Sequence, residues 1–311
     1  MDIALAFGGL VVGFVVGLTG MGGGALMTPM LVFFFGVNPL AAVSSDLVVS
    51  AIMKPFGGIV HLRRGTVDLR LVGWLVLGSV PSAFAGVLLL RALGDDAAVQ
   101  EFVRVALGAA LLLAALGLIG KAYMSMAKSA RRRRGMEPAP VREVGHNVSV
   151  RPLPTVLVGA VGGVIVGMTS VGSGSLIIIA LLLLYPRLQA SQLVGTDLVQ
   201  AVPLVAAAAL GHLLFGDFRL DVTVSLLAGS IPGVLLGASV SSRAPGGVVR
   251  RALALVLLAS GLKLLGASTA LTAAAILLAV LLGPIAWMAA RRHQGLPALR
   301  RRRKVTSRAP E

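Results

Sequence analysis

The chain has 311 residues, of which 57% are hydrophobic and 13% are charged. Soluble domains carry about 25% charged residues, so this composition excludes a soluble globular protein and indicates a membrane protein. There is no cysteine, which excludes disulfides and thiolate chemistry.

The net charge is +16, and all but two of the 28 Lys and Arg residues lie between the apolar stretches or in the tail. Cytoplasmic loops of membrane proteins are enriched in these residues, so we interpret the charge as topological. The basic runs Arg131–Arg134 and Arg300–Lys304 lack interleaved aromatic residues. Nucleic acid is therefore not predicted as a partner.

The first apolar stretch covers residues 3–35 and has a glycine cluster in its middle. As one helix it would be about 50 Å long, whereas a bilayer core is roughly 30 Å thick. Each glycine also costs about 1 kcal/mol in a helix interior. The sequence therefore predicts two half-helices that meet at a Gly-rich break, Thr19–Gly24. Three spans are expected to follow, at residues 40–61, 69–91 and 102–121.

The second half of the chain repeats the first. GFVVGLTGMGGGAL, which starts at Gly13, matches GVIVGMTSVGSGSL, which starts at Gly163. Further on, Asp46 in its Asp-Leu-Val sequence matches Asp197 in the same sequence. Agreement at one register over a long segment indicates an internal repeat. The second half thus predicts a broken stretch at residues 153–185, interrupted at Thr169–Gly174, then spans at 190–212, 221–242 and 248–266, and one extra span at 269–290.

We therefore expect an all-α polytopic membrane protein made of two repeats, each a Gly-broken helical hairpin plus three spans. The predicted segments are a first membrane repeat (1–122), a basic cytoplasmic linker (123–152), a second membrane repeat (153–266), an extra transmembrane helix (267–290) and a basic cytoplasmic tail (291–311).

The charges of equivalent loops predict that the two repeats are inverted. Loop 62–70 carries three Arg against one Asp, whereas its counterpart 213–221 carries one Arg against two Asp. Because basic loops face the cytoplasm, these two loops are expected on opposite faces of the inner membrane. Inverted repeats are a recurring plan of secondary transporters. A parallel repeat with an imperfect charge bias is the alternative.

The two breaks are the first candidate site. In transporters of this plan, Gly-interrupted segments at matching positions indicate the substrate site. A half-helix that starts after a break presents free N–H groups and the positive end of its dipole, which suit an anion. The alternative is that the glycines only allow close helix packing. The candidate residues in the breaks are Thr19, Gly20, Gly22, Gly23, Gly24, Thr169, Ser170, Gly172, Ser173 and Gly174.

Ionisable residues inside apolar spans complete the candidate site, because such residues are costly there and usually functional. Asp46 and Asp197 occupy matching positions, and Lys54 follows Asp46 on the same expected helix. Lys54 could hold an anion, or it could line a polar interior or pair with another helix. For the two Asp residues, helix capping or solvation at a span end is the alternative. No catalytic residue, metal site or cofactor is predicted.

Taken together, the breaks GLTGMGGG and GMTSVGSG, the SSD and GTD that open the next spans, and the GSVPSAFAG and AGSIPGVLLG segments resemble the TauE/SafE sulfite exporter family. The resemblance extends to about residue 266. It implies a secondary transporter that moves sulfite, an organosulfonate or a similar oxyanion by alternating access. It also implies a substrate path along Thr19–Gly24, Thr169–Gly174, Asp46 and Asp197. Serines in the second break and the extra C-terminal span depart from the family pattern.

Two other functions stay open at this point: an anion channel, and a membrane scaffold that transports nothing. An enzyme is not expected, since the spans contain no HExxH or GxSxG motif. The expected partners are a small anion and the lipid bilayer. The sequence leaves open whether the chain forms a homo-oligomer and whether a proton is its coupling ion.

Overall fold

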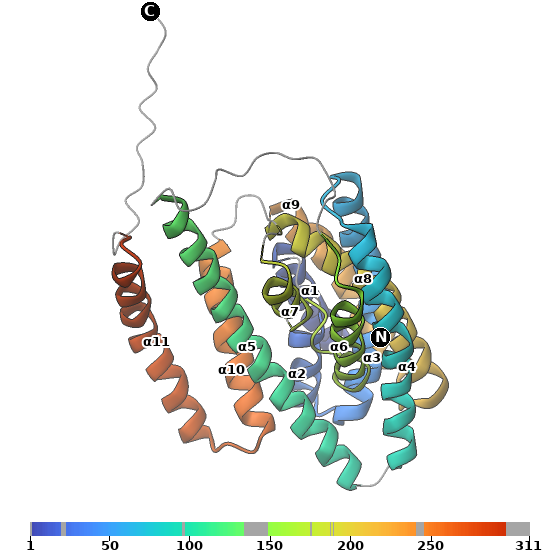
Figure 1. Cartoon of the computed structure of the whole chain (residues 1–311). Helices are drawn as coiled ribbons and strands as arrows, with labels where there is room; N and C mark the ends of the chain where they lie inside the picture. The colour runs from blue at the N-terminus through green and yellow to red at the C-terminus, as the bar shows by residue number, and fades with distance from the viewer. Residues whose placement is uncertain are drawn as a thin grey trace, which may run out of the picture.

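The computed structural model is built from α-helices (Figure 1). It describes residues 2–19, 23–94, 97–133, 149–174, 176–186, 188, 190–240 and 246–296, and in this part of the chain there is no strand. The helices are α1 (Ile3–Thr19), α2 (Gly24–Phe34), α3 (Pro39–Arg63), α4 (Leu69–Leu93), α5 (Ala97–Arg133), α6 (Pro152–Thr169), α7 (Leu176–Leu184), α8 (Ala190–Phe215), α9 (Leu220–Val240), α10 (Gly246–Leu264) and α11 (Thr269–His293).

Both long apolar stretches are broken into two half-helices, as the sequence predicts. With 11 and 9 residues, α2 and α7 are too short to cross a bilayer core of roughly 30 Å. Each also turns back along its predecessor. A Cβ on Gly8 of α1 would lie 2.8 Å from the sulfur of Met30 in α2. Tyr185, just after α7, makes a 2.6 Å hydrogen bond to Thr155 near the start of α6. Each pair is therefore a hairpin.

Seven helices are long and apolar enough to cross a membrane within the described residues, namely α3, α4, α5, α6, α8, α9 and α11. This confirms a polytopic membrane protein. α10, which we also expected to span, does not meet that measure. α5 differs from the expected span because it continues from residue 121 to Arg133. Residues 122–133 contain neither Gly nor Pro and are rich in Ala, Met, Lys and Arg, which favour helix, so the first part of the expected linker is helical.

Helices of the two halves interleave through glycines. A Cβ on Gly13 of α1 would lie 2.4 Å from the carbonyl oxygen of Ser230 in α9, closer than real Cβ contacts come. The equivalent glycine of the second half, Gly163 in α6, is equally close to the carbonyl of Ser79 in α4. α1 thus packs on α9, and α6 packs on α4, with backbones in contact along a stripe of small residues. Close helix packing, which was the alternative role for the glycines of the breaks, is thus the role of Gly13 and Gly163, which lie outside the breaks.

Equivalent helices of the two halves run antiparallel where they meet. Ser44, near the start of α3, makes a 2.7 Å hydrogen bond to His212, near the end of α8. Arg104, near the start of α5, donates to the carbonyl of Leu264 at the end of α10 over 3.0 Å. An inverted repeat would place its equivalent helices in this way. The orientation of each half in the membrane stays a prediction.

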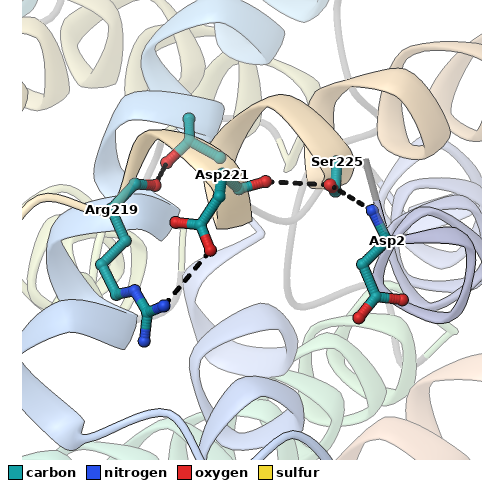
Figure 2. A network of polar contacts seen from close by, with 5 residues as sticks. Asp2, Arg219, Asp221 and Ser225 are labelled. Carbon is teal, nitrogen blue, oxygen red and sulfur yellow. Dashed lines mark hydrogen bonds and ion pairs between the residues drawn. The ribbon is translucent and has the colours of Figure 1, made fainter.

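The N-terminus of α1 is held by α9, as Figure 2 shows. The backbone N–H of Asp2 donates to the hydroxyl of Ser225 over 2.9 Å, and this hydroxyl donates to the carbonyl of Asp221 over 2.8 Å. Arg219 pairs with the Asp221 carboxylate at 3.2 Å. These contacts tie the first residues of one half to a helix of the other. At the opposite edge of the bundle, α11 lies beside α10 (Figure 1).

Cysteine labelling tests the inverted topology. We expect cysteines at Ala98 and Gly216 to react with an impermeant maleimide from the periplasm, and cysteines at Gly65 and Gly246 to react only from the cytoplasm. The natural chain has no cysteine, so the labelling has no background. Reaction of Gly65→Cys and Gly216→Cys from the same side would show that the repeats are parallel.

Candidate substrate site

The two Gly-rich breaks, one from each half, lie against each other. A Cβ on Gly24 would lie 2.1 Å from the carbonyl oxygen of Ser170 and 2.6 Å from its hydroxyl oxygen. Only a glycine allows the start of α2 to approach the second break so closely. The structure thus brings together two segments that the sequence analysis selected as one candidate site.

The second break is a turn with left-handed residues. Ser170, which ends α6, has φ 58° and is the only non-glycine residue with positive φ in the described part of the chain. Gly172 and Gly174 follow with φ 130° and 118°. Such residues end a helix by turning the chain away from its axis. This turn presents the side chains of Ser170 and Ser173 to the first half.

Asp46 of α3 is fully buried at this junction and accepts three hydroxyl hydrogen bonds. Thr28 of α2 and Ser170 of the second break each donate to Oδ2 over 2.7 Å. Ser50, one turn further along α3, donates to Oδ1 over 3.2 Å. Asp46 therefore connects α2, which follows the first break, with the second break through one carboxylate. This position rules out helix capping or solvation at a span end, which was the alternative for Asp46.

Lys54 and Asp197 contact the later residues of the second break, Ser173 and Gly174. Lys54 is buried on α3, and its ammonium group donates a hydrogen bond to the hydroxyl of Ser173. Asp197 of α8 is buried, accepts from Gln200 over 3.3 Å and takes the backbone N–H of Gly174. Lys54 lies close enough to interact electrostatically with both Asp46 and Asp197. The positive charge of Lys54 thus interacts with both buried carboxylates.

The remaining candidates occupy the ends of the breaks. A Cβ on Gly23 would lie 3.3 Å from the Ser50 hydroxyl, so the start of α2 faces the Asp46 cluster. The hydroxyl of Thr19 donates to the carbonyl of Val15 over 2.8 Å, and that of Thr169 donates to the carbonyl of Ile165 over 2.6 Å. Both threonines therefore use their hydroxyls at the ends of α1 and α6. The candidates Gly20 and Gly22 lie outside the described residues.

Three residues of the cluster were not predicted: Thr28, Ser50 and Gln200. Ser50 follows Asp46 by four residues and precedes Lys54 by four, so these residues form one polar face on an apolar helix. Gln200 follows Asp197 by three residues on its helix. Helical spacing from the two Asp residues could have identified both. Thr28 has no such signal, because only folding brings α2 against α3.

The sequence predicts two helix N-termini that present free N–H groups to an anion, and the structure differs from this in one respect. The N–H of Gly174, just before α7, is already taken by Asp197. In this conformation the donors at the second break therefore include an amide that an internal carboxylate occupies. A ligand anion would have to compete with Asp197 for that amide.

Comparison with known proteins identifies the family. The family model described as "Sulfite exporter TauE/SafE" matches residues 5–264. The chain belongs to this family. No solved structure matches it.

Curated relatives agree with this assignment. The probable membrane transporter protein YjnA of Bacillus subtilis (strain 168) is 39% identical over 271 residues, which cover 85% of this chain and all of YjnA. The probable membrane transporter protein YdhB of the same organism is 23% identical and covers 81% of this chain and 96% of its own. A probable membrane transporter protein of Xylella fastidiosa (strain Temecula1 / ATCC 700964) is 26% identical and covers 78% of this chain and 85% of its own. The chain is a membrane transporter.

A methyl group at Gly24 should separate the two breaks. Because its Cβ would overlap the backbone of Ser170, we expect Gly24→Ala to lower stability by about 1–3 kcal/mol, the usual cost of overpacking. The change should appear as a lower melting temperature of the purified protein in detergent. Gly73→Ala is the matched control, since nothing lies within 4 Å of a Cβ there. Equal melting temperatures for the two variants would contradict the contact between the breaks.

Proposed function

We propose that the protein is a secondary transporter that carries a small oxyanion, of the sulfite or organosulfonate class, across the inner membrane by alternating access. The observation that carries the proposal is the position of Lys54. Lys54 is only 7% exposed on an apolar helix, and its ammonium group donates to Ser173, in the break of the opposite half. Buried cations inside spans are costly and are kept for substrates or ions.

The side chains around Lys54 suit a small oxyanion. Away from bulk water, an anion needs hydrogen-bond donors from the protein. Lys54 offers an ammonium group, and Ser173, which accepts from it, offers a hydroxyl hydrogen; charge-assisted hydrogen bonds are the stronger kind. Small side chains and glycines dominate both breaks, so the cluster fits a compact anion better than a bulky one. The family description, which names sulfite export, supports the same substrate class.

The burial of the cluster favours a transporter over a channel. Asp46 and Asp197 are 0% and 1% exposed, and Ser170 is 4% exposed. An open anion channel would have a hydrated path past these groups. An occluded cluster between two half-helices is instead the arrangement that alternating access requires, because the site must close before it opens to the other side.

The glycine contacts suggest which parts move. α1 packs on α9 and α6 packs on α4 with backbones touching, so each tight pair contains one helix from each half. Movement of one repeat as a body against the other would have to open both of these interfaces. We therefore propose that the moving bodies are the interleaved pairs, α1 with α9 and α4 with α6, and that they separate at the breaks.

Substitution of Lys54 tests the function. In proteoliposomes loaded in turn with sulfite, sulfate, thiosulfate and methanesulfonate, we expect the natural protein to carry at least one of these anions. Lys54→Met should reduce that flux by at least about tenfold, since the loss of a charge-assisted hydrogen bond costs about 1.5–3 kcal/mol. Lys54→Arg, which keeps the charge, should retain more flux. Full activity in both variants would make Lys54 a structural residue, and flux at channel rates would contradict a transporter.

Distance measurements test the moving bodies. Ile3 of α1, Leu220 of α9 and Leu69 of α4 are exposed and suit spin labels on introduced cysteines. We expect the Ile3–Leu220 distance to stay constant when a transported anion is added, and the Ile3–Leu69 distance to change. The opposite result would mean that each repeat moves as one body, because Ile3 and Leu69 belong to the same half.

A further inference from the structure

The two buried carboxylates of the site have different surroundings. Asp46 receives hydrogen bonds from three neutral hydroxyl groups, those of Thr28, Ser50 and Ser170. Asp197 instead receives an amide N–H from Gln200 and one from the backbone of Gly174. Both carboxylates interact with the charge of Lys54, and Asp197 also interacts with that of Lys121. Among the described residues, no Lys, Arg or His nitrogen lies within 4.0 Å of either carboxylate.

The charge balance of the cluster creates a problem for an anion. With the carboxylates of Asp46 and Asp197 and the ammonium groups of Lys54 and Lys121, the empty cluster is formally neutral when all four are ionised. Entry of a monovalent anion would leave a charge of −1 in a region of low dielectric, where an uncompensated charge is costly. The two ammonium groups already offset the two carboxylates. A further positive charge that enters with the anion, or before it, would remove this cost.

We propose that Asp46 takes up a proton when the anion binds, so that the protein moves a proton and an anion together. The proposal rests on the transport function proposed above and assigns Asp46 a role other than contact with the anion. A proton on Asp46 restores neutrality once a monovalent anion is bound. The loaded and empty clusters then carry the same charge, and a cycle with one proton per monovalent anion moves no net charge across the membrane.

The geometry favours a proton over a metal ion such as Na⁺. The oxygen atoms of Thr28 and Ser170 lie 2.7 Å from Asp46 Oδ2, a distance that leaves room for a hydrogen atom between them. A cation bound among these oxygens would push them apart. A protonated Asp46 needs no such rearrangement, because a hydroxyl group can accept a hydrogen bond as well as donate one.

The other groups that face Asp46 are less suited to take up the proton. α2 contributes Thr28 and the second break contributes Ser170, neither of which titrates. The charged groups are Lys54 on α3 itself, Asp197 on α8 and, beyond Asp197, Lys121 on α5. His212 of α8 contacts neighbouring Ser44 and the carbonyl of Gly167, so both of its ring nitrogens already have partners.

The test uses methanesulfonate, whose charge stays constant in the working pH range, so that any pH effect belongs to the protein. If the proteoliposomes above carry it, an acidic exterior should drive its uptake, up to about tenfold accumulation per pH unit for one proton per anion. We expect Asp46→Asn to abolish the response to the pH gradient while exchange of labelled for unlabelled anion stays measurable. Asp46→Glu should restore part of the response.

Two further variants make the result specific. Asp221→Asn, at an exposed carboxylate, should respond to the pH gradient as the natural protein does. Asp197→Asn changes the other buried carboxylate and should impair exchange as well, because it disturbs Gly174 and Lys54. Melting temperatures show whether each variant is folded.

The outcomes separate this proposal from the function it rests on. If the natural protein carries none of the anions, the proposed function fails. If it carries methanesulfonate without any response to a pH gradient, or responds to a sodium gradient instead, the proton proposal fails alone. It fails equally if folded Asp46→Asn still accumulates the anion in response to the pH gradient, or if folded Asp46→Asn loses exchange together with accumulation.

Discussion

The contact between the two breaks is the constraint on which the rest of the site depends. A helix that ends inside a membrane leaves backbone and side-chain polar groups without water, and each of these groups must find a partner within the protein. Here several of the partners come from the opposite half. Ser170 lies against Gly24 and donates to Asp46, while Lys54 donates to Ser173. Neither half could bury its own break alone at the same cost.

The glycine stripes of α1, α6 and their partners make this contact possible. Because Gly13 and Gly163 let backbones touch, each hairpin is locked against a helix of the other half. Each hairpin therefore reaches the contact between the breaks as part of a mixed pair, that is, a pair with one helix from each half: α1 with α9, and α6 with α4. The same packing supports the proposal that each mixed pair moves as one body, since backbone contacts without side chains between them are hard to open and re-form.

The two halves are alike in backbone but not in charge. Asp46 and Asp197 occupy equivalent positions, yet the residue equivalent to Lys54 in the second half is Val205. The surroundings of the two carboxylates differ as well, since Asp46 lies among hydroxyl groups and Asp197 receives amide hydrogen bonds. A duplicated membrane unit can in this way assign different tasks to its two copies.

Much of this protein follows from its sequence. Length, glycine position and hydropathy predict the broken hairpins and most spans, because the bilayer thickness sets what an apolar segment can do. The offset between Asp46 and Asp197 shows the repeat, and their polarity within apolar helices marks both as candidates. The end of α5 was missed because the basic charge of this segment was interpreted as that of a loop, although its residue types favour helix.

Only the tertiary structure decided which residues meet. It placed Ser170 against Gly24, brought Thr28 to Asp46 and gave Gly13 and Gly163 a packing role. These contacts join segments more than a hundred residues apart or on different helices, and no local spacing encodes them. The sequence by itself determined which polar groups are buried in apolar helices. The tertiary structure decided which partners they bind, because a buried polar group is satisfied only by an atom at hydrogen-bond distance.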